Sequence, residues 1–232
     1  MEQKPIVFLL KATKEKYVKS TLERGRFCFS HPTIFSKWED NRSAQYDRWE
    51  GHAAVEALDV MISPIMGYRD DGFPIYGKVS RLTDKATIHS QTGEAQNSPI
   101  CCFRMVERSE IALSGSNLYY TLGETARRII TEFGYDSYIL IQAEPFMERM
   151  KQTKEFRIAG SVIYQNIMNQ FPQSLPEEYE SIAEQLLRKD KKYEWQKEYR
   201  IILKPTKEEQ VFLELGSIED IARSGKLVDL IK

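Results

Sequence analysis

Short apolar runs and polar segments of helical length alternate at the start of the chain. Residues 6–10 form a β-like run, Thr13 predicts a helix N-cap, and Gly25 predicts the end of that helix. Residues 26–30 return to a strand pattern, which Pro32 closes. The opening of the chain therefore predicts a strand, a helix and a second strand.

The pattern changes type several times through the middle of the chain. Residues 41–57 place Trp49, His52, Ala53 and Glu56 at helical spacings and predict a helix. Residues 58–68 and 73–79 are rich in β-forming residues, and the turn-forming residues 69–72 between them predict a hairpin. Residues 83–98 are mostly polar, which predicts a flexible loop that could serve as a lid.

The second half contains both periodicities. Residues 100–106 predict a strand, residues 115–133 a helix and residues 137–142 a buried strand. A charged helical stretch begins at Pro145. A strand is predicted at residues 161–164 and an amphipathic helix at residues 176–190. A pair of strands follows at residues 199–203 and 210–215, and a last helix begins at Ser217.

This alternation, which has no internal repeat, is typical of the α+β class. We expect one domain over residues 1–232, with mixed, mainly antiparallel sheets and flanking helices. Hydrophobic residues make up 41% of the chain and charged residues 29%, which is enough apolar material for a core.

Charge and cysteine content narrow the classes of function. The chain has 33 Lys and Arg against 34 Asp and Glu, so its formal net charge of -1 favours neither a nucleic acid nor a membrane as a general partner, while a local basic groove stays open. No stretch approaches the roughly 18 apolar residues that span a bilayer. The three cysteines, Cys28, Cys101 and Cys102, fit neither a disulfide framework nor a zinc site. We therefore expect a cytoplasmic protein with these cysteines as small core residues on strands, no metal and no membrane partner.

The densest local signal lies near the C-terminus. Alternation along a strand at residues 198–203 places Glu198 and Arg200 on one face and the core residues Tyr199 and Ile201 on the other. Because an unpaired buried charge is unfavourable, the charged face must see water or line a polar cleft. A solvated face with cross-strand ion pairs and a functional site are equally good interpretations of this pattern.

The same region carries a family resemblance. Trp195, Glu198, Tyr199 and Arg200, preceded by a lysine-rich approach, resemble the signature of a large uncharacterised family of bacterial and prophage proteins. The front end agrees with that family, with Lys11 on the first strand and Ser30-His31-Pro32 after the second. The acidic element of the family is matched by Asp47 and Glu50, although its proline is missing here. The resemblance covers the two ends of the chain and leaves the middle unaccounted for.

A second resemblance suggests a mechanism. The opening strand, helix and strand, with Lys11, Thr13 and Ser30, are similar to the start of the ADP-ribosyltransferase fold, and Glu198 matches that superfamily's catalytic glutamate on a late strand. The resemblance implies NAD as substrate, with Glu198 and Arg200 in catalysis and Lys11, Thr13, Ser30 and Asp47 in NAD binding. Lysine stands where the superfamily usually has histidine or arginine.

The implied reaction attaches ADP-ribose to a macromolecule, as a toxin or phage-defence effector would. A carboxylate near the ribose would stabilise the positive charge that develops as nicotinamide leaves. The acceptor, protein or nucleic acid, is left open.

The alternative is a module without chemistry that binds a protein or nucleic acid through residues 195–200. The basic run at residues 188–192, next to Tyr193 and Trp195, is typical either of such a contact or of a solvated helix end. Three other features predict no site: the isolated histidines, the turn at residues 70–72 and the solvated loop at residues 107–110.

Overall fold

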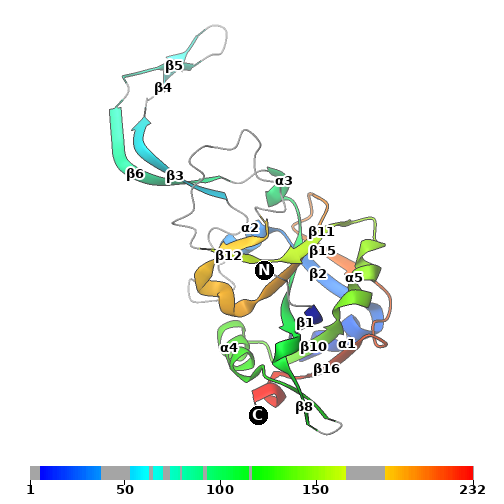
Figure 1. Cartoon of the computed structure of the whole chain (residues 1–232). Helices are drawn as coiled ribbons and strands as arrows, with labels where there is room; N and C mark the ends of the chain where they lie inside the picture. Colours follow the sequence, from blue (N-terminus) through cyan, green and yellow to red (C-terminus); the bar gives the residue numbers. More distant parts are fainter. Residues whose placement is uncertain are drawn as a thin grey trace.

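A computed structural model describes residues 6–37, 53–62, 65–69, 74–78, 80–90, 93–114, 117–165 and 186–231 (Figure 1). The protein belongs to the α+β class, with a mainly antiparallel sheet and several helices. None of the helices in these ranges is long and apolar enough to cross a membrane.

One mainly antiparallel sheet forms the centre of the protein. Its strand order is β11-β14-β7-β1-β10-β16, and β2 joins it by pairing with both β7 and β15. The bounds are β1 Ile6–Thr13, β2 Arg26–Ser30, β7 Ile100–Glu107, β10 Ser137–Gln142, β11 Phe156–Ser161, β14 Glu198–Leu203, β15 Gln210–Glu214 and β16 Ala222–Lys226.

Smaller elements surround the sheet. The helices are α1 Glu15–Arg24, α2 Pro32–Lys37, α3 Gly93–Gln96, α4 Gly123–Phe133 and α5 Ala143–Lys151, with 3-10 turns η1 Arg108–Glu110, η2 Lys191–Gln196 and η3 Leu227–Ile231. Four two-stranded pairs are formed by β3 Ala53–Ile62 with β6 Ser80–Ser90, β4 Ile65–Tyr68 with β5 Pro74–Tyr76, β8 Ile111–Ser114 with β9 Asn117–Tyr120, and β12 Ile163–Gln165 with β13 Arg188–Asp190. Figure 1 shows the β3–β6 ribbon projecting from the sheet with β4 and β5 at its far end.

Each face of the sheet has its own core. On one face, the rings of Phe27, Phe103 and Phe146 lie 5.2–5.7 Å apart by centroid, under α1 and α5. On the other face, α4 and η3 pack over Leu10 and Val106. The two faces alternate along each strand because successive side chains point to opposite sides.

The opening strand, helix and strand are confirmed, with one correction. The N-cap of α1 is Lys14, and Thr13 is instead the last residue of β1, opposite Ser137. Gly25 ends the helix in the left-handed conformation with φ of 59°, and a Cβ there would lie 2.4 Å from the Gly216 carbonyl oxygen. A glycine is therefore required at this helix end.

Two predictions in the middle of the chain are wrong. Residues 53–57 belong to β3, not to a helix, while residues 41–52 lie outside the described residues. Residues 83–90, expected in a loop or lid, belong to β6, which pairs with β3 from Ser80 to Ser90. Long pairing with a partner strand outweighs the polar composition of this segment. The predicted hairpin is confirmed as β4 with β5.

Several predictions in the second half are also corrected. Residues 117–120 form β9 ahead of α4, and residues 188–190, expected to end a helix, form β13; residues 176–185 lie outside the described residues. β15 pairs with β2 and not with β14, whose neighbours are β7 and β11. Ser217 begins no helix; a turn leads into β16 and η3.

Candidate functional site

The central sheet splits beside the middle of β7. β1 pairs with β7 as far as Leu10 opposite Arg104, and β2 meets β7 at Ser30 opposite Ile100. Between these two contacts, the described pairings give residues 101–103 no strand neighbour on this side. A cavity of about 630 Å³ opens at the split. This volume lies within the roughly 300–1,000 Å³ usual for small-molecule sites.

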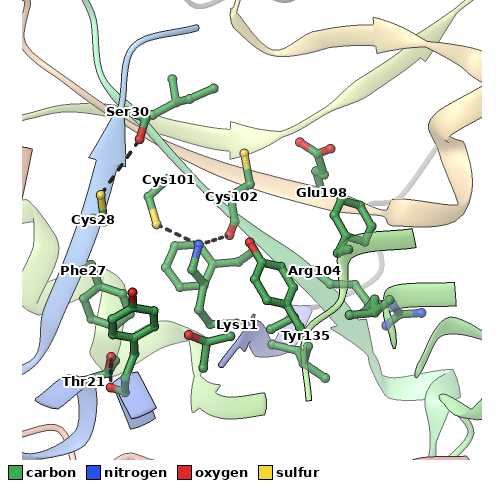
Figure 2. Close-up of a pocket in the computed structure, with 18 of the residues that line it drawn as sticks. Lys11, Thr21, Phe27, Cys28, Ser30, Cys101, Cys102, Arg104, Tyr135 and Glu198 are labelled. Atoms are coloured by element: carbon green, nitrogen blue, oxygen red, sulfur yellow. Dashed lines mark hydrogen bonds between the residues drawn. The ribbon is translucent and has the colours of Figure 1, made fainter. Parts of the chain in front are cut away.

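Lys11 reaches across the split from β1. Its Nζ donates a hydrogen bond to the Cys102 carbonyl at 2.9 Å and lies 3.3 Å from the Cys101 Sγ (Figure 2). The same atom lies 5.3 Å from the centroid of the Phe103 ring. The ammonium group thus binds a β7 carbonyl that faces the gap between the strands. Among the described residues, no carboxylate lies within ion-pair distance of Lys11.

The site holds Lys11 as a cation and Cys101 as a neutral thiol. Burial lowers the pKa of Lys11, but Cys101, Tyr135 and Cys102 together raise it by more, so the pKa stands above its usual value of 10.5. Burial raises the pKa of the Cys101 thiol and outweighs the opposing effect of Lys11. The cavity therefore offers an anion a positive charge but offers no thiolate nucleophile at Cys101.

Aromatic side chains form much of the cavity wall. They come from both faces of the sheet and from the helices that cover it: Tyr17, Phe27, Phe103, Phe133, Tyr135, Trp195 and Phe212. Arg128 stacks on Trp195, with its Cζ 3.8 Å from the ring centroid. Planar aromatic walls combined with cations suit a ligand that carries both flat rings and negative charge.

Glu198 is buried and ion-paired. Its Oε1 lies 2.6 Å from the Lys189 Nζ, and its Oε2 accepts a hydrogen bond from the Arg200 Nε at 2.8 Å. Lys189 also donates to the Gln196 Oε1 at 3.0 Å, and the Glu198 backbone amide donates to the Tyr164 hydroxyl at 2.7 Å. Although burial acts to raise the pKa of Glu198, Arg200 and Lys189 bring it below its usual value, so Glu198 is a carboxylate.

The prediction that Glu198 and Arg200 share a face opposite the core is confirmed, but a solvated face is wrong. Their exposed fractions are 7% and 0%, and Tyr199 and Ile201 belong to the apolar core on the other side of β14. Lys189 covers this face of β14. It belongs to β13, and its ammonium group lies against the Glu198 carboxylate. A strand pattern alone shows which residues share a face but not what covers that face.

A second ion network lies beside the first on β7. Arg104, directly opposite Glu198 in the β14–β7 ladder, binds both carboxylate oxygens of Glu110, at 2.7 and 3.1 Å. Lys197 adds ion pairs to Glu110 at 3.1 Å and to Glu107 at 3.4 Å. The expected solvated loop at residues 107–110 is therefore wrong for Glu110, whose side chain is only 13% exposed, whereas Arg108 is exposed as expected. This network holds the turn after β7 in place.

Four of the six predicted site residues line the same cavity: Lys11, Thr13, Ser30 and Glu198. Arg200 donates a hydrogen bond to Glu198 but is not among the lining residues described, and Asp47 lies outside the described residues. Lys11 sits on the face of the sheet that holds Phe103, while Glu198 sits on the opposite face with Arg104. Figure 2 shows the Glu198 carboxylate pointing away from the Lys11 ammonium. The cavity passes through the split and is therefore lined from both faces.

Sequence reasoning gave Tyr135 no role in a site, and it considered Lys189 and Gln196 as parts of a surface that binds a macromolecule, although all three line the cavity. The helix predicted over residues 176–190 includes Lys189, and a helix does not bury every second residue. In the structure, the strand Arg188–Asp190 buries only its central residue, Lys189, which is the alternation expected of a strand. Tyr135 follows the Gly134 that ends α4, and nothing in its local pattern indicates a site.

Among the residues that the structure describes, no cluster of three or more His, Cys, Asp or Glu side chains could hold a metal ion. Comparison with known proteins gives no match: no family model, no curated protein and no solved structure is similar to this chain.

Proposed function

We propose that the protein binds NAD in the cavity at the sheet split and transfers its ADP-ribose part to a macromolecular acceptor. The observation that carries the binding step is the lining of the cavity, which combines flat aromatic walls with the Lys11 ammonium, a cation without a carboxylate partner among the described residues. A dinucleotide offers both aromatic rings and a negatively charged diphosphate. Stacking and charge pairing would therefore act on different parts of one ligand.

Glu198 supports the transfer step. In that step the bond between the ribose C1′ and nicotinamide breaks, nicotinamide leaves with the bonding electrons, and an acceptor atom bonds to C1′ and releases its proton. A carboxylate has about four acceptor positions, so Glu198 can accept a ribose hydroxyl in addition to its hydrogen bonds from Lys189 and Arg200. The lowered pKa of Glu198 keeps it charged, as stabilisation of a cationic ribose requires.

One observation favours a second candidate, a nucleotide-binding module without chemistry. Both oxygens of Glu198 already lie against cations, which weakens any stabilisation of positive charge on the ribose. Lys11 and Glu198 also lie on opposite faces of the sheet, so a ligand that touches both must pass through the split.

A thermal shift and a product assay separate the two candidates. Saturation with NAD at about 100 times its dissociation constant should stabilise the folded protein by about 2.7 kcal/mol. A transferase should also release nicotinamide, which chromatography detects. With NAD labelled in its adenine part, it should attach the label to macromolecules of a cell lysate. Stabilisation without nicotinamide release supports the binding module. Absence of both effects would contradict the proposal.

A further inference from the structure

Two exposed aromatic rings stand at the mouth of the cavity. The large apolar side chains that are most exposed in the described part of the chain include two aromatic ones, Tyr17 of α1 at 51% and Phe212 of β15 at 54%. Both line the cavity. They lie near each other, because the Thr21 hydroxyl is within hydrogen-bond distance of the Tyr17 and Arg26 carbonyl oxygens and the Arg26 side chain lies over the Phe212 ring. Exposed apolar side chains that gather at one place on a surface usually mark a binding site. We call these two residues the mouth aromatics.

A cationic side chain lies close to the ring of each mouth aromatic. The Lys16 Nζ lies 4.9 Å from the centroid of the Tyr17 ring, and the Arg26 Cζ lies 4.4 Å from that of the Phe212 ring. Arg26 also has Glu214 at 3.9 Å, but both of these side chains are more than two-fifths exposed. An exposed pair of this kind is weak, so the guanidinium group can exchange its partner for a phosphate.

The ladder between β2 and β15 directs Phe212 toward the cavity. Phe212 lies opposite Cys28, and both residues line the cavity, whereas their neighbours Phe29 and Leu213 pack into the core. The ring of Phe212 is thus fixed at the edge of the opening by the strand pairing. Tyr17 occupies the mouth from α1, together with Ser20 and Thr21 of the same helix.

We propose that the mouth aromatics stack on the bases of a single-stranded nucleic acid, which is the macromolecular acceptor. This inference rests on the proposed transferase and names its acceptor. Single-strand binding proteins combine aromatic platforms, on which successive bases stack, with cations that follow the phosphates. The mouth shows this combination, with Tyr17 and Phe212 as platforms and Lys16 and Arg26 as cations. A ligand enclosed in the cavity would leave half-exposed rings at the mouth uncovered, whereas a chain crossing the mouth would cover them.

In the transfer step, an acceptor nitrogen of the stacked base bonds to the ribose C1′ as nicotinamide departs with the electrons of the broken bond. The base nitrogen then gives up its proton to solvent. The stacked base would need to point toward the cavity, which is where the proposed NAD site lies.

The test is a titration of the full chain into a fluorescently labelled oligothymidine of about 12 nucleotides, followed by anisotropy and carried out without NAD. We expect binding that weakens roughly 5- to 150-fold in Phe212→Ala and in Tyr17→Ala, the range expected when one stacking ring is removed. The matched control is Val228→Ala, because Val228 is 60% exposed but is not among the cavity-lining residues described. Both mouth residues are exposed, so these variants should fold.

Salt dependence gives a second readout. Two phosphate contacts predict a slope of about -1.4 for log K against log salt concentration, and Arg26→Met should reduce that slope by about 0.7. Equal binding by the Phe212→Ala variant, or preference for a duplex or an acidic peptide over the single strand, would overturn the inference. Because NAD is absent, this result is independent of the NAD thermal shift: stabilisation by NAD with no oligonucleotide binding leaves the proposed function standing and removes only this acceptor.

Discussion

Lys11 and Lys189 both line the cavity, yet their positive charges are matched in different ways. The Lys189 ammonium lies 2.6 Å from the Glu198 carboxylate and makes a further bond to Gln196. The Lys11 ammonium has only neutral neighbours among the described residues, the Cys102 carbonyl, the Cys101 thiol and the Phe103 ring. The two lysines lie on opposite sides of the split sheet.

This difference indicates that the charge of Lys189 stabilises the fold, whereas the charge of Lys11 is available to a ligand. A buried carboxylate with a cation on each oxygen holds strands β13 and β14 together, and losing one member removes an interaction that offsets the burial of the others. A cation with neutral partners keeps most of its field for whatever enters the cavity. We therefore expect removal of Glu198 to affect folding first, and removal of Lys11 to affect ligand binding first.

The largest expected effect is the loss of folding stability when Glu198 is replaced. Glu198→Gln should lower the free energy of unfolding by about 3–5 kcal/mol, because Lys189 and Arg200, two buried like charges, would lose the carboxylate that pairs with both. Urea unfolding followed by circular dichroism measures this change. The control is Glu107→Gln, whose side chain is 24% exposed and whose ion pair to Lys197 should contribute less than about 1 kcal/mol. An equal effect of the two substitutions would remove the structural role of Glu198.

The next effect is a pH dependence from the same carboxylate. The folded-state pKa of Glu198 is about 2, below its usual 4.5, so its ionisation stabilises the folded protein at pH values above 4.5. This contribution, about 3 kcal/mol, should disappear as the pH falls from 4.5 toward 2. Unfolding free energies measured across this window should fall more steeply in the wild type than in Glu198→Gln. Parallel curves would show that Glu198 titrates normally in the folded protein.

The smallest expected effect on folding stability is that of replacing Lys11. Lys11→Met should change the free energy of unfolding by no more than about 1 kcal/mol, since the loss of the bond to Cys102 is offset by removal of a desolvated charge. The same variant should lose most of its stabilisation by NAD, measured by thermal shift. A large loss of stability with NAD binding intact would reverse the comparison and make Lys11 the structural lysine.

Parts of the site could be predicted from local patterns. Alternation at residues 198–203 predicted that Tyr199 and Ile201 face the core and that Glu198 and Arg200 face the other way, and the structure confirms both. It could not predict burial of the charged face, because the covering side chain, Lys189, reaches it from β13.

The errors in the predicted elements have a common cause. The helix predicted over residues 53–57 and the loop predicted over residues 83–90 are in fact two strands, β3 and β6, that pair with each other. Each segment has an ambiguous pattern when taken alone, and its strand conformation depends on the hydrogen bonds of its partner. The same reason explains why β15 was matched with the wrong strand.

The sequence by itself determined the α+β class, the opening strand, helix and strand, the hairpin and the placement of the cysteines on strands, because these depend on periodicities of two and 3.6 residues and on single turn residues. Only the tertiary structure decided that β1 and β2 leave β7 at different points, that the cavity opens there, and that Lys11 and Glu198 line it from opposite faces. Strand order and register join residues far apart in the chain, and no local pattern encodes that pairing.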